Sequence, residues 1–219
     1  PDTAEPVIPD VLMVRHPKGG WMVELNSETL PRVLVNSSYH AQVLKTPMSR
    51  EDRKYLADQL QTANWLVRAL HQRATTILKV SAEIVRRQDG FFQKGVSHLK
   101  PMVLRDVADE IEMHESTVSR VTSNKYIVTP RGIFELKYFF SSSISATDGG
   151  DAHSAEAVRH RIREMIDAED PKKILSDDKL VKLLVADGYD IARRTVAKYR
   201  ESLRIGSSVE RRRQKAGPK

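Results

Sequence analysis

The apolar residues between Ser49 and Arg87 follow one uninterrupted helical pattern. No glycine or proline occurs there, and the apolar or small positions alternate in steps of four and three residues, as along one face of a helix. Ser49 and Asp52 have the spacing of a capping box, and Asp89 and Gly90 would end the helix. We expect one helix of roughly 60 Å, at 1.5 Å per residue. Its seam consists of Leu56, Leu60, Ala63, Val67, Leu70, Ala74, Ile77, Ser81 and Ile84.

Such a seam also suits a coiled-coil dimer. The alanines and the serine among its positions favour packing against several short elements of the same chain instead. We therefore interpret the long helix as a spacer between modules.

Residues 104–122 predict two short helices joined by a turn. Apolar or small residues stand where a helix-turn-helix needs them, although Glu112 occupies the usual glycine position of the turn. The exposed side of the second helix would carry short hydroxyls and an arginine, which suit phosphates and base edges. The inward positions are Val107, Ala108, Ile111, Met113, Val118 and Val121, and the outward ones are Ser116, Thr117, Ser119, Arg120 and Ser123, followed by Asn124 and Lys125.

Two turn-rich segments lie between runs of strand-forming residues. Residues 11–14 and 21–25 flank one turn and predict a β-hairpin, and residues 126–128 and 133–136 flank another that would form a small wing. Because a two-stranded hairpin is marginal alone, we expect the first hairpin to belong to a domain whose other half is missing from this chain.

The last 70 residues predict a three-helix domain. Ser154 and Ser176 are suited to cap two helices. The apolar positions are Val158, Ile162, Met165 and Ile166 in the first helix and Leu180, Leu183 and Leu184 in the second. Residues 141–151 are polar and contain glycine, so we expect a flexible linker before this domain.

The stretch from Asp190 to Arg204 predicts the third helix, with Asp190 as its N-cap. Val196, Tyr199 and Leu203 would share one side, whereas the other side is cationic. A solvated amphipathic helix would show the same pattern. Small residues among the arginines would nevertheless allow the helix backbone to approach a partner closely. The cationic side carries Arg193, Arg194, Lys198, Arg200 and Arg204, with Ala192, Thr195 and Ala197 between them.

The positive charge of the chain is concentrated at its C-terminal end. The formal net charge is +7, and residues 192–219 contain ten Lys or Arg and two Asp or Glu, so the rest of the chain sums to about −1. Such a local excess is typical of a module that binds a polyanion. We expect residues 211–215 to form a disordered basic tail that attracts phosphates without sequence preference.

The sequence lacks the patterns of several other classes of protein. There are no cysteines, no apolar run of the roughly 18 residues that cross a bilayer, and no signal-peptide pattern, so we expect a cytoplasmic protein. No catalytic motif is present, and we expect neither an enzyme nor a cofactor or metal. A recombinase-like set of Arg159, His160, Arg163 and Tyr199 can be assembled, but a buried role explains the tyrosine better.

The residues Ala192 to Arg200, ARRTVAKYR, are identical to the RpoN box, the signature of the RpoN-type (sigma-54) bacterial transcription initiation factors. The preceding DGYDI, the segments at 117–126 and 129–145, and the long helix resemble the same family in the same order. The resemblance covers nearly the whole chain, as the end of a core-binding domain, a helix-turn-helix domain and an RpoN-box domain.

This resemblance implies a mainly α protein with two helix-turn-helix DNA-binding domains, one long helix and a small N-terminal β-hairpin. Its partners would be double-stranded promoter DNA and bacterial RNA polymerase core, with no membrane. The RpoN-box helix would enter the major groove at an upstream GG element, with Arg193 and Arg194 reading guanines and Lys198 and Arg200 holding the backbone. The first helix-turn-helix would lie at a downstream GC element, with Arg120 as its leading base or phosphate contact.

The sequence lacks the glutamine- and leucine-rich N-terminal region through which the family answers an AAA+ activator, so that partner is expected only for a full-length protein. The remaining rival is a two-module repressor or plasmid partition protein, which would protect symmetric half-sites as a dimer rather than two unlike elements about one helical turn apart. The expected domains are 1–45 (end of the core-binding domain), 46–90 (long helix), 91–145 (helix-turn-helix with wing), 146–150 (linker), 151–206 (RpoN-box domain) and 207–219 (tail).

Overall fold

The computed structural model describes residues 7–215, except for residues 30, 32, 148 and 150–151. The chain divides into two compact units, each described by itself below. Unit 1 consists of Pro1–Glu83 and Arg120–Leu136, and unit 2 of Ile84–Ser119 and Lys137–Lys219. Among the described residues, no helix has the length and apolar character needed to cross a membrane.

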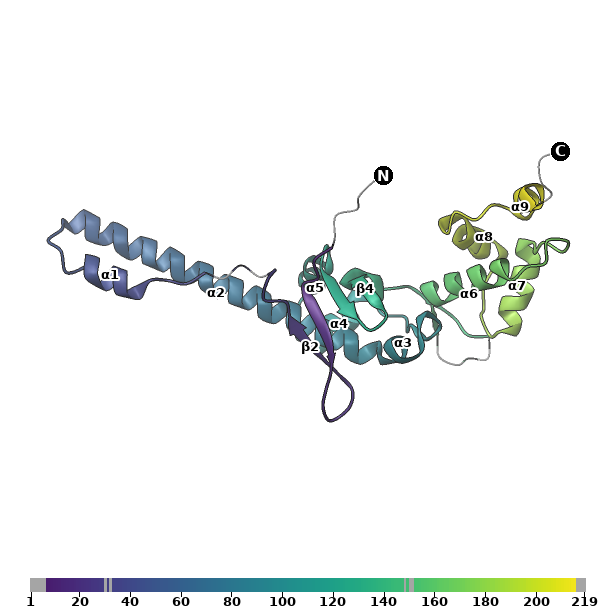
Figure 1. The fold of residues 1–219 in the computed structure, drawn as a ribbon, viewed down its shortest axis with the longest axis horizontal. Helices are drawn as coiled ribbons and strands as arrows, with labels where there is room; N and C mark the ends of the chain where they lie inside the picture. Colours follow the sequence, from purple (N-terminus) through teal and green to yellow (C-terminus); the bar gives the residue numbers. More distant parts are fainter. Residues whose placement is uncertain (1–6, 30, 32, 148, 150–151, 216–219) are drawn as a thin grey trace. The chain divides into compact units, whose positions relative to one another are not determined.

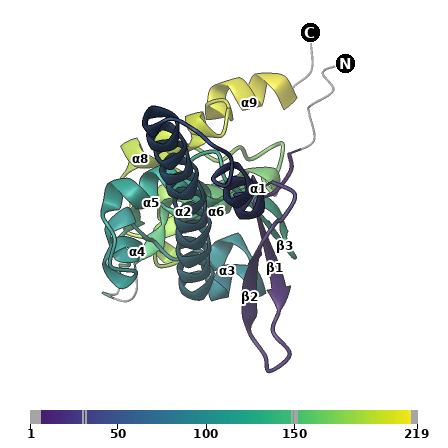
Figure 2. The same cartoon turned by 90° about the vertical axis from the view of Figure 1, so that its left-hand side faces the viewer.

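The long helix α2, Arg50–Arg87, is confirmed as one continuous element (Figure 1). Its capping box is present, since Asp52 N donates to Ser49 Oγ at 3.0 Å and Ser49 N donates to Asp52 Oδ2 at 3.3 Å. The seam positions are half-buried in the first part of the helix and buried from Ile77 onward. Figures 1 and 2 both show the short helix α1, Ser37–Val43, beside the first half of α2.

The N-terminal hairpin and the wing belong to one sheet within unit 1. Strands β1, Val11–Arg15, and β2, Trp21–Leu25, pair antiparallel, as do β3, Tyr126–Thr129, and β4, Gly132–Glu135. The strand order is β2-β1-β3-β4, because β1 and β3 pair in parallel. Asp10 reinforces this junction by accepting a hydrogen bond from Tyr126 N at 3.0 Å. The hairpin is therefore not isolated, because the wing of the same chain extends its sheet to four strands.

In unit 2, the chain after α2 is organised around an aromatic cluster and a buried amide. Phe91 and Phe92 contact Phe139 with ring centroids 5.4 and 5.5 Å apart. The fully buried side chain of Gln88 donates to Lys100 O and accepts from Lys100 N, both at 2.9 Å. The elements here are α3 (Asp89–Lys94), the 3-10 helix η1 (Val96–His98), α4 (Leu104–Glu110), α5 (Glu115–Thr122, whose end belongs to unit 1) and η2 (Leu136–Phe139).

The expected linker at 141–151 is largely paired where the structure describes it. Strand β5, Ser143–Ile144, pairs with β6, His153–Ser154, and Thr147 N donates to Gly188 O at 3.0 Å. Backbone groups that hydrogen-bond in this way hold the segment against the domain that follows. The prediction of a flexible linker is therefore wrong for these residues, whereas 148 and 150–151 lie outside the described residues.

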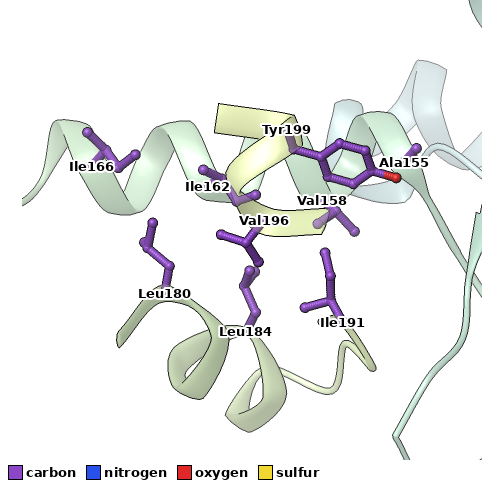
Figure 3. Packing of buried hydrophobic residues seen from close by; sticks show 9 residues of the cluster. All are labelled: Ala155, Val158, Ile162, Ile166, Leu180, Leu184, Ile191, Val196 and Tyr199. Carbon is purple, nitrogen blue, oxygen red and sulfur yellow. The ribbon is translucent and has the colours of Figure 1, made fainter. Parts of the chain in front are cut away.

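The C-terminal part of unit 2 contains the predicted three helices and a fourth. Ser154 and Ser176 cap α6 and α7 as expected, because their side chains accept hydrogen bonds from Ala157 N and Lys179 N. Both helices pack against α8 through buried aliphatic residues (Figure 3). The bounds are α6 Ala155–Asp167, α7 Asp177–Ala186, α8 Arg193–Ser202 and α9 Ser208–Lys215.

Candidate nucleic-acid interface

Helix α8 is the second helix of a helix-turn-helix formed with α7. Gly188 lies in the turn with φ +96°, a conformation that glycine adopts without strain. The inner side of α8 is sealed, since Val196 is fully buried and Tyr199 is 6% exposed. Figure 3 shows both side chains directed into the cluster formed by α6 and α7, which includes Leu184. This packing fixes which side of α8 meets solvent.

The exposed side of α8 carries three of the predicted cations. Arg193, Arg194 and Lys198 are exposed, and Thr195 and Ala197 are half-buried beside them. The side chain of Arg193 is 69% exposed and lies 3.3 Å from Asp178 Oδ1 through its Nη1. Small or short residues between long cations let the helix backbone approach a groove while the guanidinium groups reach further in.

Arg200 does not lie on this exposed side. It is 5% exposed, and its Nε and Nη2 donate to Asp177 Oδ1 and Oδ2 at 2.9 and 3.2 Å. Its Nη1 donates to Ile205 O at 2.8 Å. The hydrogen bond with Asp177 raises the pKa of Arg200 further above its ordinary value. The expectation that Arg200 is available to hold a DNA backbone is therefore wrong, because all three guanidinium nitrogens already have partners inside the protein.

The ends of α8 also differ from the expectation. The N-cap is Ala192, without a side-chain hydrogen bond, so Asp190 lies two residues too early to cap the helix. The helix ends at Ser202, and Arg204 follows with φ +57°. Arg204 is exposed, but it projects from the turn after the helix and not from its cationic side.

The C-terminal basic segment is helical where the structure describes it, so the expectation of a disordered tail is wrong for residues 211–215. Arg211 is 5% exposed and donates from Nε and Nη2 to the two oxygens of Glu169 at 2.9 and 3.0 Å. Lys215 Nζ lies 3.2 Å from Glu169 Oε1. Although burial raises the pKa of the Glu169 carboxyl, the hydrogen bonds from Arg211, Leu175 N and Lys215 bring it below its ordinary value.

The first helix-turn-helix consists of α4 and α5, as predicted. Glu112 stands in the turn with φ +55°, where glycine would be unstrained, and Met113 N donates to Ala108 O at 2.9 Å. Val107 and Val118 are fully buried.

The predicted contact residues of this first module lie in different environments. Ser116 and Arg120 are exposed on α5, whereas Thr117 and Ser119 are half-buried. The Ser116 hydroxyl is 2.8 Å from His114 Nδ1. Lys125 is not a free cation, since its side chain is 21% exposed and its Nζ lies 3.5 Å from Asp10 Oδ1.

Sequence reasoning missed the carboxylates that hold these cations. The predicted site residues include none of Asp177, Asp178 and Glu169. No local signal pairs Asp177 with an arginine 23 residues further along, or Glu169 with one 42 residues further along. Nowhere in the described ranges do three or more His, Cys, Asp or Glu side chains gather as a metal site requires.

Two family models match this chain. Residues 53–213 match the model described as "Sigma-54, DNA binding domain", and residues 1–39 match "Sigma-54 factor, core binding domain". The RNA polymerase sigma-54 factor of Azorhizobium caulinodans is 64% identical over 210 residues, covering 96% of this chain and 41% of that protein. The sigma-54 factor of Caulobacter vibrioides is 61% identical over 214 residues, covering 97% and 43%.

A solved structure is similar over nearly the same range. The crystal structure of Aquifex aeolicus sigmaN bound to promoter DNA has a TM-score of 0.58 and 32% identity, covering 96% of this chain and 62% of that one. The chain thus spans 41% and 43% of the two sigma-54 factors above. The resemblance drawn from the RpoN box is confirmed: the chain belongs to the sigma-54 family of RNA polymerase sigma factors.

Proposed function

We propose that this chain binds promoter DNA as a sigma-54 factor and reads two short elements with its two helix-turn-helix modules. The exposed side of α8 would enter the major groove at an upstream GG element. The exposed residues of α5 would contact a downstream GC element. The observation that carries the proposal is the placement of Arg193 and Arg194 on the exposed side of α8, opposite a sealed apolar core.

The chemistry of guanine supports these roles. In the major groove guanine presents two acceptors, N7 and O6, and an arginine can donate to both at once. We assign this contact to Arg193 and Arg194, and assign Lys198 and Arg204 to phosphates, where a cation positions the protein without reading sequence. Thr195 and Ala197 would lie closest to the bases and permit the approach. Arg200 serves instead to hold the helix, through Asp177.

The first module offers a different set of groups. Ser116, Thr117 and Ser119 would donate to or accept from phosphates and base edges, and Arg120 would supply its base contact. Lys125 is engaged by Asp10, so we leave it out of this interface. The module would therefore gain less affinity from phosphates than the second one does.

The match of residues 1–39 to a core-binding domain supports a second partner, bacterial RNA polymerase core. In a sigma-54 factor of this kind, the two DNA-binding modules would bring this partner to the promoter. Response to an AAA+ activator would require the full-length protein.

Binding of the full chain to synthetic duplexes tests the proposal. Four duplexes carry both elements, GG replaced, GC replaced, or both replaced, and are compared by fluorescence anisotropy at one salt concentration, because affinity depends steeply on salt. We expect replacement of GG to lower affinity about tenfold or more, and replacement of GC to lower it less. Equal affinity for all four duplexes would contradict sequence reading.

Hydroxyl-radical footprinting on the same duplex distinguishes a sigma-54 factor from a repressor. Two unlike protected regions about one helical turn apart are expected, as for one chain with two modules. A symmetric pair of protected half-sites that requires a dimer would favour the repressor or partition protein.

A further inference from the structure

Two neighbouring carboxylates in the first turn of α7 each hold an arginine of α8. Asp177 pairs with Arg200 near the end of α8, and Asp178 lies 3.3 Å from the guanidinium of Arg193 at its start. In the first pair Arg200 is buried and Asp177 half-buried, whereas the second pair is exposed, with side chains 69% exposed for Arg193 and 59% for Asp178. Among the described residues, the structure records no hydrogen bond or ion pair of the Arg194 side chain, although Arg194 is also exposed.

The pair of Asp177 with Arg200 holds the turn of backbone that carries the exposed carboxylate. Arg200 donates twice to Asp177, and Leu180 and Leu184 are fully buried against the same core as Val196. The first turn of α7 is thereby fixed against α8. The backbone of Asp178, one residue further on, is therefore held beside the start of α8, and its carboxylate lies 3.3 Å from the first arginine of the cationic side.

A carboxylate at this position weakens attraction to phosphates on every DNA sequence, so it does not serve general affinity. It can instead help α8 to distinguish guanine from other bases. An arginine presents five N–H donors in a planar fork, and a partner that occupies one edge limits the orientations of the rest. Arg193 held in this way loses less side-chain freedom when it meets N7 and O6 of guanine, and reorients less readily toward a phosphate or another base.

We infer that Asp178 is a specificity-determining residue, which orients Arg193 for guanine and disfavours its use on other sequences. This inference rests on the proposed function of α8. It makes the two arginines unequal: Arg193 would discriminate between bases more strongly than Arg194, for which the described residues show no such carboxylate.

The variant Asp178→Asn in the full chain tests the inference. Affinity is measured for the duplex with GG and for the duplex with GG replaced, at one salt concentration. We expect the ratio of the two affinities to fall about fivefold, chiefly because binding to the replaced duplex becomes tighter. The matched control is Asp167→Asn, which removes the same charge from the exposed last residue of α6. It should leave the ratio unchanged.

A double-mutant comparison shows whether the effect passes through Arg193. In an Arg193→Ala background, Asp178→Asn should not change the ratio further, whereas in an Arg194→Ala background it should retain its effect. Arg193→Lys gives an independent measurement that leaves Asp178 intact. It keeps the charge but not the fork, so we expect binding to both duplexes with a reduced ratio.

The outcomes separate the inference from the function on which it rests. If the wild-type chain shows no preference for GG, the proposed function fails. If the wild type prefers GG and Asp178→Asn keeps the full ratio, only the inference is overturned. A loss of ratio that is equally large in the Arg193→Ala background would also overturn it, because Asp178 would then act through another group. Circular dichroism of each variant establishes that its helices are retained, and the same ratio measured for Asp178→Ala decides the matter if Asp178→Asn does not fold.

Discussion

The two helix-turn-helix modules solve the same structural problem with different chemistry. In the α4–α5 module the turn residue is Glu112 with φ +55°, whereas in the α7–α8 module it is Gly188 with φ +96°. The first presents hydroxyls and Arg120, and its ion pair between Arg105 and Glu115 is exposed. The second presents several cations and holds another arginine in its interior.

The difference shows that an arginine count alone does not measure a DNA-binding surface. Arg193, Arg194 and Arg200 belong to the same nine-residue signature, yet two are exposed and one is buried against Asp177. In the second module, the buried arginine stabilises the helix on which the exposed ones are presented. In the first module, Arg105 and Arg120 are both exposed.

Removing Asp177 should break the second module most severely. Asp177→Ala leaves the buried guanidinium of Arg200 without its counter-charge, which costs about 3–5 kcal/mol of unfolding free energy. Urea denaturation of the full chain, followed by circular dichroism, measures the loss. The matched control is Asp178→Ala, whose exposed pair with Arg193 is worth about 0–1 kcal/mol. Equal losses for the two variants would show that the Asp177–Arg200 pair does not anchor the module.

The carboxylate of Glu169 should make the second module sensitive to acid. Because the folded pKa of Glu169 lies below its ordinary value, this group adds stability at pH values above its unfolded pKa, and the stability is lost as pH falls through the folded pKa. Unfolding free energies of the wild type and of Glu169→Gln are compared from pH 7 to pH 3. The variant should be less stable by about 3 kcal/mol at pH 7. The gap should narrow below about pH 4.5. A gap that is constant across this range would contradict the assignment.

Removing the exposed arginines one at a time should show which module reads which DNA element. Arg193→Ala or Arg194→Ala should each cost about 1–3 kcal/mol of binding free energy on the GG duplex, and Arg120→Ala should lower preference only at the GC element. Competition binding at fixed salt measures each loss. Lys215→Ala is the control. Lys215 pairs with Glu169, and its replacement should weaken binding to all sequences slightly. If all four variants weakened every duplex equally, the division of roles between the modules would be wrong.

The turn of the first module offers the smallest test. Glu112→Gly should stabilise the chain by about 0.5–1 kcal/mol, because glycine adopts a positive φ without the steric cost that a side chain incurs. Thermal unfolding measures the gain. Asp109→Gly, at an exposed position within α4, should have the opposite sign, since glycine within a helix is unfavourable. A loss of stability in both variants would show that Glu112 makes contacts that outweigh its backbone strain.

Local sequence patterns predicted the helices and strands of this protein better than they predicted which elements pair with one another. The caps at Ser154 and Ser176 and the buried side of α8 at Val196 and Tyr199 follow from spacing within a few residues. The parallel pairing of β1 with β3 joins residues 116 positions apart, and nothing in either strand specifies the other. Such pairings depend on how the whole unit folds. The pattern of residues within one strand carries no information about this.

The same limit applies to the candidate interface. Arg193, Arg194 and Lys198 were placed correctly because helical spacing separates them from Val196 and Tyr199. Arg200 and Arg211 were misplaced because an arginine that meets water and one that meets a buried carboxylate look alike in sequence. Their burial depends on Asp177 and Glu169, which are distant in sequence and lie next to them only in the folded structure.

The most direct test of major-groove reading by α8 removes the guanine acceptor that the exposed arginines would contact. Binding of the full chain is measured, at one salt concentration, to a duplex with GG and to the same duplex with 7-deazaguanine at both upstream guanines, which lack N7 in the major groove. We predict that the wild type loses about tenfold or more in affinity. The Arg193→Ala, Arg194→Ala double variant should bind both duplexes alike. Undiminished wild-type affinity for the modified duplex would contradict major-groove reading by α8.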